Sequence, residues 1–108
     1  GGGWAAIGIA RAYPGITVEG FDPDAESVRI ATQNAAEAGL SKRIRFHGID
    51  GAEAAALGQQ FDLVCAFECI HDMSNPAAVL ASMRKLAGEH GTVLVMDERV
   101  ANTWRCEP

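Results

Sequence analysis

Two periods of hydrophobicity alternate along this chain. Some short runs are almost wholly apolar, such as FDLVCAF at 61–67, while other segments place an apolar residue every three or four positions. The first pattern is typical of strands covered on both faces, and the second of helices with one buried face. Strands are predicted over 16–21, 44–49, 61–67 and 92–96, with helices between them. This alternation predicts an α/β fold with right-handed crossovers: a three-layer, Rossmann-like, doubly wound and mostly parallel sheet.

Turn and capping residues mark where the helices begin and end. Asp22 is expected to cap the helix that follows it, with Pro23 in the first turn of that helix. The helix should stop at Gly39, with Leu40 folding back in a Schellman contact. Its narrow apolar face consists of Val28, Ala31, Ala35 and Ala38. A later helix opens at Pro76, and its predicted buried face consists of Val79, Leu80, Met83 and Leu86.

Composition narrows the class of protein. Of 108 residues, 48% are hydrophobic and 21% are charged, which is ordinary for one globular domain. No apolar run approaches the roughly 18 residues of a membrane span, and no basic and apolar leader opens the chain, so neither a membrane protein nor a secreted one is expected. A net charge of −5 without a run of Lys or Arg argues against nucleic acid as a partner.

The cysteines give a prediction about the compartment. Cys65, Cys69 and Cys106 are odd in number and form no C-x-x-C pair. Neither a disulfide framework nor a metal site is therefore expected, and a reducing, cytoplasmic location is predicted.

Residues with binding chemistry follow the predicted strands, at the sheet edge where open α/β folds bind their ligands. The glycine turn at 1–3 would bring backbone N–H groups and a helix N-terminus toward an anionic group. Asp22 can accept both hydroxyls of a ribose, and Asp50 can accept the amino N–H of an adenine. Phe67 and Glu68 follow the next strand, where a planar ring or a reacting group would lie. Together, the residues at these strand ends predict that the ligand is a nucleoside with a small anionic tail.

Each of these features also has a purely structural interpretation. A glycine cluster is often only a turn, and Asp22 can serve only as a helix cap. The pair Asp50-Gly51 can be an ordinary turn, and Phe67 can belong to the core. The order and spacing of the set are more specific than any one member, since Asp22 follows Gly3 by 19 residues and Asp50 follows Asp22 by 28.

In this order the chain resembles the class I S-adenosylmethionine-dependent methyltransferases. The resemblance covers residues 1 to about 100 and rests on the blocks GGGWAAIG, VEGFDPD, ATQNAAEAGL, FDLVCAFE and GTVLVMDE. Gly1 and Gly3 match the last two glycines of the family motif acidic-x-Gly-x-Gly-x-Gly, whose leading acid and first glycine are missing here. The resemblance implies that residues 1–108 are a partial methyltransferase domain, the cofactor-binding half, with S-adenosyl-L-methionine as its cofactor.

The resemblance also assigns contacts to this cofactor. Gly1 and Gly3 would approach its methionine portion, and Asp22, in the loop with Pro23, would hold its ribose. The residues assigned to its adenine are Asp50 and Gly51, and those assigned to its reactive end are Phe67 and Glu68.

In this family the first strand lies at the centre of the sheet, between the strands that here end at Phe21 and Phe67. Because no strand precedes Gly1, we expect an incomplete sheet with two unpaired inner edges. Such edges favour self-association, and the chain as written is expected to bind the cofactor weakly.

His71 is the candidate general base. Methyl transfer from a sulfonium is an in-line displacement that needs alignment and a dry site but no metal, and a hydroxyl or amine acceptor also has to lose a proton. His71 follows the strand whose end would face the methyl group, and Asp72 or a neighbour would orient it. The structural alternative is a partly exposed loop histidine. His47 and His90 are interpreted as structural.

The acceptor is predicted only as a class. The stretch ECIHDM at 68–73 resembles a subgroup of these methyltransferases that acts on small molecules. A small-molecule methyl acceptor is therefore expected. The residues that select it lie largely beyond the matched blocks.

Two alternatives stay open on the sequence alone. The opening letters GGGWAA satisfy the dinucleotide pattern G-x-G-x-x-G/A, and Asp22 lies near the roughly 20-residue spacing of its ribose acid, which permits an NAD(P)-binding oxidoreductase domain. Against this stand Asp50, after the following strand, and the blocks at 61–68 and 91–97. The second alternative is a truncated, non-catalytic module that keeps the fold without turnover.

Overall fold

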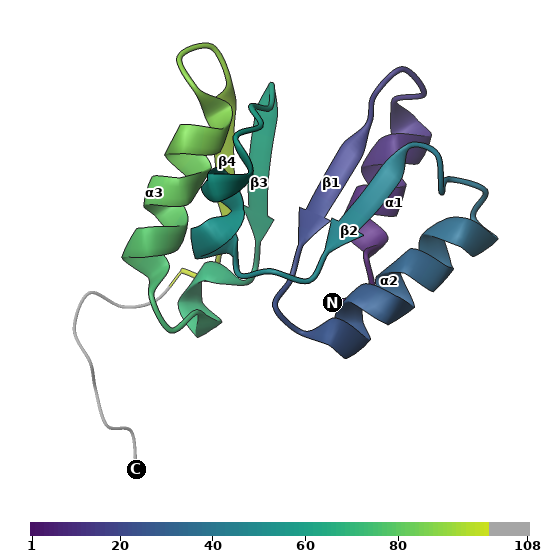
Figure 1. Ribbon diagram of the computed structural model, residues 1–108, viewed down its shortest axis with the longest axis horizontal. Helices are drawn as coiled ribbons and strands as arrows, with labels where there is room; N and C mark the ends of the chain where they lie inside the picture. The colour runs from purple at the N-terminus through teal and green to yellow at the C-terminus, as the bar shows by residue number, and fades with distance from the viewer. Residues whose placement is uncertain (100–108) are drawn as a thin grey trace.

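The computed structural model describes residues 1–99, and residues 100–108, which include Cys106, lie outside the described part. Helices and strands alternate as predicted (Figure 1). In chain order the elements are α1 (Trp4–Ala12), β1 (Val18–Phe21), α2 (Ala25–Glu37), β2 (Ile44–His47), the 3₁₀ helix η1 (Gly51–Leu57), β3 (Leu63–Phe67), the 3₁₀ helix η2 (Ile70–Asp72), α3 (Pro76–Ala87) and β4 (Thr92–Met96). The first three strands are each two residues shorter than predicted. Two of them begin late because the N–H groups of Ile16 and Phe61 donate to a turn and to α3 instead of to a neighbouring strand.

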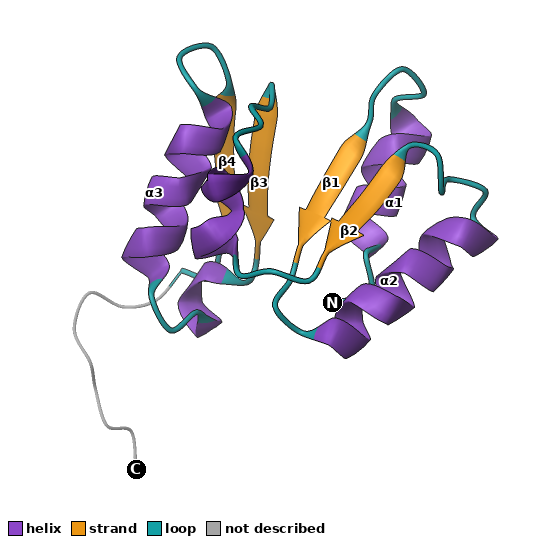
Figure 2. Ribbon diagram, in the orientation of Figure 1, coloured by secondary structure: helices purple, strands orange, loops and turns teal. Residues whose placement is uncertain are grey.

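The four strands form two separate parallel pairs. β1 pairs with β2, so that Phe21 lies opposite His47, and β3 pairs with β4, so that Phe67 lies opposite Met96. Within residues 1–99 no backbone pairing joins β1 to β3. The strands nevertheless point the same way, so that the carboxyl ends of β1, β2 and β3 lie at one edge of the molecule (Figure 2). The predicted incomplete α/β sheet is confirmed, with its gap between the strands that end at Phe21 and Phe67.

α1 and α2 pack against β1 and β2 around a core of small and branched side chains. Its buried members are Ile7, Ala10, Ala35, Leu40 and Ile44. The predicted end of α2 is confirmed, because Gly39 has a φ of 73° and its N–H donates to the Ala36 carbonyl at 3.0 Å. The Leu40 N–H donates to the Ala35 carbonyl at 2.9 Å, which completes a Schellman motif. The side chain of Leu40 is thereby buried in this core, next to the end of α2.

α3 packs on β3 and β4 around a second core, whose buried members are Ala66, Val79 and Met83. The predicted face of α3 is right for Val79, Met83 and Leu86 but wrong for Leu80, which is 43% exposed. Ser82 lies on the buried face instead. A polar group is tolerated there because the Ser82 hydroxyl accepts the Ala55 N–H of η1 at 3.2 Å.

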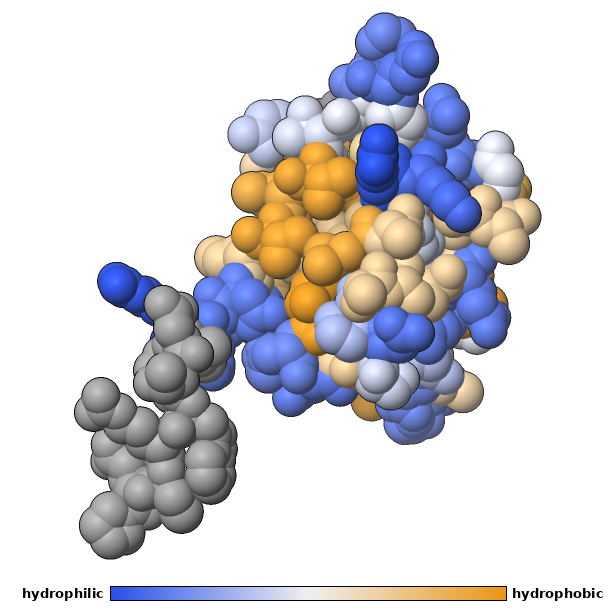
Figure 3. All heavy atoms as spheres, turned by 90° about the vertical axis from the view of Figure 1, so that its left-hand side faces the viewer, coloured by the Kyte–Doolittle hydropathy of each residue, from blue (hydrophilic) through white to orange (hydrophobic). Residues whose placement is uncertain are grey.

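Within the described part of the chain, the face of β3 and β4 that points away from α3 is exposed to solvent. Every residue of β4 is exposed, with Val93 to Met96 between 40% and 53%. The prediction that these apolar strands are covered on both faces is therefore wrong for the described residues, because α3 covers one face only. Figure 3 looks from the side of α3 and shows apolar side chains gathered on the surface. None of the helices described is long and apolar enough to cross a membrane.

Gly3 sets how closely the start of α1 approaches α2. It precedes α1 with a φ of 77°, and a Cβ added there would lie 2.7 Å from Phe46 Cζ and 2.9 Å from Ala31 Cβ. A side chain would therefore combine left-handed backbone strain with a clash on two sides. This position requires glycine.

Replacing Gly3 by Ala is expected to lower the free energy of unfolding by about 2–4 kcal/mol, through left-handed strain and overpacking. Gly8→Ala is the matched control, because Gly8 lies within α1 and no heavy atom lies within 4 Å of its added Cβ. That change should stabilise the helix by about 0.5–1 kcal/mol. Urea unfolding followed by circular dichroism measures both. Equal effects at the two positions would contradict the tight turn.

Candidate functional site

A cavity of about 100 Å³ lies at the carboxyl end of β1, beside the glycine turn and α2. Its lining combines the backbone of Gly1 and Gly3 with Asp22 and with apolar side chains that include Val28 and Phe46. Three of the predicted site residues therefore share one cavity. The predicted site residues that do not line it are Pro23, Asp50, Gly51, Phe67, Glu68 and His71.

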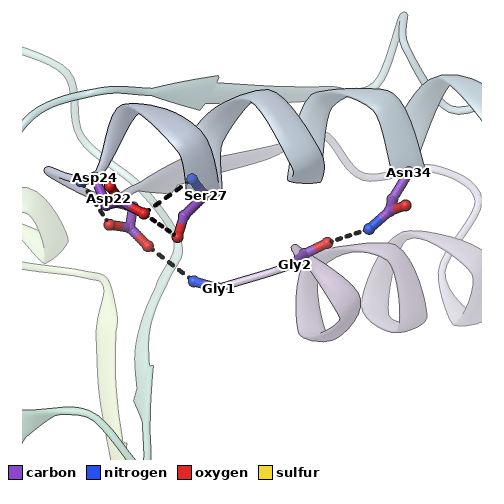
Figure 4. A network of polar contacts seen from close by, with 6 residues as sticks. All are labelled: Gly1, Gly2, Asp22, Asp24, Ser27 and Asn34. Atoms are coloured by element: carbon purple, nitrogen blue, oxygen red, sulfur yellow. Dashed lines mark hydrogen bonds and ion pairs between the residues drawn. The ribbon is translucent and has the colours of Figure 1, made fainter.

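Both carboxylate oxygens of Asp22 accept hydrogen bonds (Figure 4). Oδ1 accepts the backbone N–H of Asp24 at 2.9 Å, which closes the turn that precedes α2. Oδ2 accepts the α-amino group of Gly1 at 2.8 Å. Oδ2 therefore faces the glycine turn and can accept a donor on the cavity side.

The cap of α2 is Asp24. Its carboxylate accepts the backbone N–H of Ser27 at 3.0 Å and the Ser27 hydroxyl at 2.7 Å, and the latter bond most strongly lowers the pKa of Asp24. The prediction that Asp22 caps this helix, with Pro23 in its first turn, is wrong, because Ser27 supplies two donors to residue 24 and the helix begins at Ala25. The carboxylate of Asp22 is thus not used in capping α2.

The glycine turn is also attached to the middle of α2. The side-chain amide of Asn34 donates to the Gly2 carbonyl at 3.0 Å (Figure 4). This bond holds the backbone of the turn against α2.

Asp50 and Gly51 follow β2, next to the Asp22 loop. The N–H of Asp22 donates to the His47 carbonyl at 3.1 Å, so the ends of β1 and β2 are directly joined. Asp50 Oδ1 accepts the Ala52 N–H at 2.9 Å and caps η1, which Gly51 begins. The structural role foreseen for Asp50 is thus present, at the same edge as Asp22 but outside its cavity.

Glu68 turns the chain sharply at the end of β3. Its φ of 52° lies in the left-handed region, which costs free energy for a residue other than glycine. Its N–H donates to the Met96 carbonyl at 2.7 Å and so holds the turn against the end of β4. Phe67, just before it, is half-buried and by strand alternation faces away from Ala66 and α3. The chain beyond Glu68 therefore passes over the end of β4.

This path brings His71, in η2, to Asp97, the first residue after β4. His71 Nδ1 lies 2.5 Å from Asp97 Oδ1, and the His71 backbone N–H donates to Asp97 Oδ2 at 3.1 Å. His71 Nε2 lies 3.3 Å from Asp72 Oδ2. The ring therefore has a carboxylate at each nitrogen: the adjacent Asp72 and a second acid far along the chain.

The two carboxylates change the protonation of the ring. The hydrogen bond to Asp97 raises the pKa of His71 above its ordinary value, and the charge of Asp72 adds to the rise. The Glu98 N–H lowers the pKa of Asp97, and His71 lowers it further. His71 thus holds its proton to a higher pH than a free histidine, and Asp97 stays ionised.

Cys69 follows Glu68 and packs against the core beneath α3. Burial raises the pKa of its thiol, and the carboxylates of Asp97 and Asp22 add to that rise. Cys65 and Cys69 are free thiols.

Asp97 is the residue of this region that sequence reasoning missed. A signal existed, because Asp97 directly follows the apolar run at 92–96, as Asp22 follows its own strand. The separation of 26 positions between His71 and Asp97 conceals the contact, which depends on the pairing of β3 with β4.

Comparison with known proteins gives a family. Residues 1–91 match the family described as "Methyltransferase domain". The ubiquinone biosynthesis O-methyltransferase of Methylobacterium nodulans is 39% identical over 80 residues, which cover 73% of this chain and 30% of that protein. The protein of the same name from Rhizobium leguminosarum is 27% identical over 95 residues, which cover 88% of this chain and 36% of that protein. The chain thus spans about a third of the length of these curated relatives.

Solved structures share the fold. The [4+2]-cyclase SpnF has a TM-score of 0.84 and 27% identity, covering 94% of this chain and 38% of its own. Residues 961–1257 of StiE, an O-MT, have a TM-score of 0.70 and 22% identity, covering 77% of this chain and 29% of that one. A Rossmann-like methyltransferase fold is the common element. With the match over residues 1–91, these likenesses show that the chain belongs to the methyltransferase-domain family, as the sequence blocks predicted.

Proposed function

We propose that this chain is the cofactor-binding half of an S-adenosyl-L-methionine-dependent methyltransferase that methylates a hydroxyl group of a small molecule. The observation that carries the proposal is the cavity shared by Gly1, Gly3 and Asp22, which joins a bare backbone turn to a carboxylate. The family match over residues 1–91 supports the cofactor. The names of the two curated relatives, both O-methyltransferases, support a hydroxyl acceptor.

The residues around Asp22 fit this cofactor. Ribose presents two hydroxyl donors, and the carboxylate of Asp22, which lines the cavity, has only acceptor atoms. The turn is bare backbone at Gly3, where a Cβ would clash with Phe46, so it can approach the anionic methionine portion closely. We assign the ribose to Asp22, in the loop with Pro23, and the methionine portion to Gly1 and Gly3.

The neighbouring strand ends would hold the remainder of the cofactor. Asp50 uses Oδ1 to accept the Ala52 N–H, so Oδ2 would accept the amino N–H of the adenine, beside Gly51. Phe67 and Glu68 end β3 and would line the reactive end. These assignments rest on the shared edge of the parallel strands.

S-adenosyl-L-methionine supplies an electrophilic methyl group when bound, which leaves the chain to align the acceptor, exclude water and accept a proton. His71, in η2, follows the end of β3, and Asp22 follows the end of β1. These two strand ends lie at the same edge of the molecule (Figure 2). We assign His71 to accept the proton that the acceptor hydroxyl loses. A metal ion has no part in this scheme.

The alternatives carry unequal weight. The family match counts against an NAD(P)-binding oxidoreductase domain. SpnF, which this chain resembles in fold, is named a cyclase. The second candidate function is therefore a domain of the same fold that does not transfer methyl groups. Turnover therefore has to be measured.

The 108-residue chain alone is expected to bind S-adenosylhomocysteine with a dissociation constant above the micromolar range. The reason is that no backbone pairing within the described residues fixes the loops of β1 relative to those of β3. Calorimetric titration with S-adenosylhomocysteine and with NAD measures this, and sedimentation of the same samples measures the predicted self-association through the unpaired edges. Micromolar binding would contradict the expectation, and binding of NAD alone would favour the oxidoreductase.

In protein expressed from the complete reading frame, Asp22→Ala is expected to weaken S-adenosylhomocysteine binding about 10–100-fold, the loss typical of hydrogen bonds to a charged group. Glu26→Ala is the matched control. It removes a carboxylate of α2 that is paired with Arg29 at 2.7 Å and 62% exposed. Equal affinities of the two variants for S-adenosylhomocysteine would contradict the assignment of the ribose to Asp22.

In the same protein, His71→Gln is expected to lower kcat about 10²–10⁴-fold with little change in cofactor affinity, since the general base is lost. A base works only when unprotonated, and the raised pKa of His71 places the acidic limb of the rate profile above the ordinary histidine value. The rate should therefore rise with pH through that limb, which the variant loses. His90→Gln, at a fully exposed position, is the control. An unchanged kcat for His71→Gln would exclude His71 as the general base.

A further inference from the structure

We propose that Asp97 is a positioning residue that fixes the ring of His71 so that Nε2 faces the methyl acceptor. This inference rests on the proposed function, because it gives His71 a defined orientation for accepting a proton. Nothing in the motifs of the chain assigns a role to Asp97. The contact depends on the parallel pairing of β3 with β4, which brings the loops after Phe67 and Met96 together.

The carboxylate of Asp97 holds both the backbone and the side chain of His71. Asp97 Oδ2 accepts the His71 backbone N–H at 3.1 Å, and Oδ1 lies 2.5 Å from Nδ1 of the ring. A ring held through its own main chain and through one nitrogen has no free rotation about its side-chain bonds. Asp97 thus determines where the second nitrogen points.

Asp97 also determines the tautomer of the His71 ring. An ionised carboxylate has only acceptor atoms, so the ring nitrogen facing Asp97 has to carry a proton. In the neutral ring this proton lies on Nδ1, and the lone pair lies on Nε2. Without Asp97 the carboxylate left at the ring would be that of Asp72, which faces Nε2 and favours a proton on that nitrogen instead. The carboxylate of Asp97 therefore selects the form of His71 that can accept a proton at Nε2.

The two acids that contact this ring differ in how firmly they are held. The side chain of Asp97 is 20% exposed and also accepts the Glu98 N–H at 2.8 Å, so it is held in place. The side chain of Asp72 is 83% exposed and approaches Nε2 at 3.3 Å. An approaching hydroxyl group can replace such an exposed partner at little cost. Asp97 is the fixed support, and Asp72 covers the nitrogen that the acceptor would reach.

The backbone around Glu68 supports this arrangement. Its φ of 52° reverses the chain after β3, and its N–H donates to the Met96 carbonyl, the residue directly before Asp97. The strained turn therefore directs η2 toward the acid. Local strain of this kind is common where a functional geometry is held in place.

Nuclear magnetic resonance of the 108-residue chain tests the positioning directly and needs no turnover. Long-range ¹H–¹⁵N spectra report the tautomer and the titration of each histidine, and His71→Gln identifies the signals of His71. In Asp97→Asn we expect loss of the dominant Nδ1–H tautomer and a lower pKa of His71. Asp72→Asn is the control and should leave the tautomer as it is. An unchanged tautomer and titration in Asp97→Asn would overturn the proposal.

Rate measurements on protein from the complete reading frame separate this inference from the proposed function. Asp97→Asn should lower kcat about 10–100-fold, leave the KM for the cofactor unchanged and move the acidic limb of the pH profile to lower pH. Asp97→Glu, which keeps the charge, should restore part of the rate. A changed tautomer with unchanged kcat in both Asp97→Asn and His71→Gln would overturn the base assigned to His71, while the hydrogen bond itself would stand.

Discussion

Among residues 1–99, neither the inner edge of β1 nor the inner edge of β3 has a hydrogen-bonded neighbour, although both strands end at the same side of the molecule. Backbone N–H and C=O groups in the interior of a protein require partners, so these two facing edges are the main constraint on the whole domain. An aromatic contact between Phe21 and Phe61, with ring centroids 6.4 Å apart, links the two halves through side chains. Side-chain contacts fix distances less firmly than a strand ladder does. The spacing between the Asp22 loop and the His71 loop therefore depends on what pairs with these edges.

Each half is well defined by itself. In the first, the guanidinium group of Arg43 donates to the carbonyls of Ala10, Tyr13 and Ile16 at 2.9, 3.4 and 3.2 Å, which ties the end of α1 to the loop before β1. In the second, His71 and Asp97 are joined through the pairing of β3 with β4. The proposed cofactor contacts at Asp22 thus belong to one half, and the proposed proton acceptor to the other. Methyl transfer needs both at a fixed separation, which makes the order of the central sheet a condition for activity.

Local rules predicted most of the fold. The Schellman end at Gly39 follows from the freedom of glycine at positive φ, and the alternation of elements follows from two clear periods of hydrophobicity. Position-specific errors arose where two residues could serve equally. Asp22 and Asp24 both precede α2, and only the two donors of Ser27 decide between them. The spacing of apolar residues in α3 predicts Leu80 on the buried face, but Leu80 is exposed, and Ser82 lies on that face with its bond to η1.

The candidate site was less accessible to such rules. Asp22 could be named because it follows its strand within a recognisable block, and the structure adds that it shares a cavity with Gly1 and Gly3. Asp97 could not be linked to His71, because the link is a matter of strand order and not of spacing along the chain. The open face of β4 was likewise invisible, since an apolar strand has the same letters whether one face is covered or two. Features that depend on contacts between residues far apart in the chain cannot be predicted from a single sequence.

Asp24 caps α2, whereas Asp22 lines the cavity, and this difference affects how the domain can change over evolutionary time. The side-chain cap of α2 is provided by residue 24, so a change at residue 22 removes the bond to the Asp24 N–H but leaves the cap in place. Mutations there can explore other ligands without melting the neighbouring helix. Position 22 is therefore a place where selectivity can drift or be redesigned while the scaffold survives.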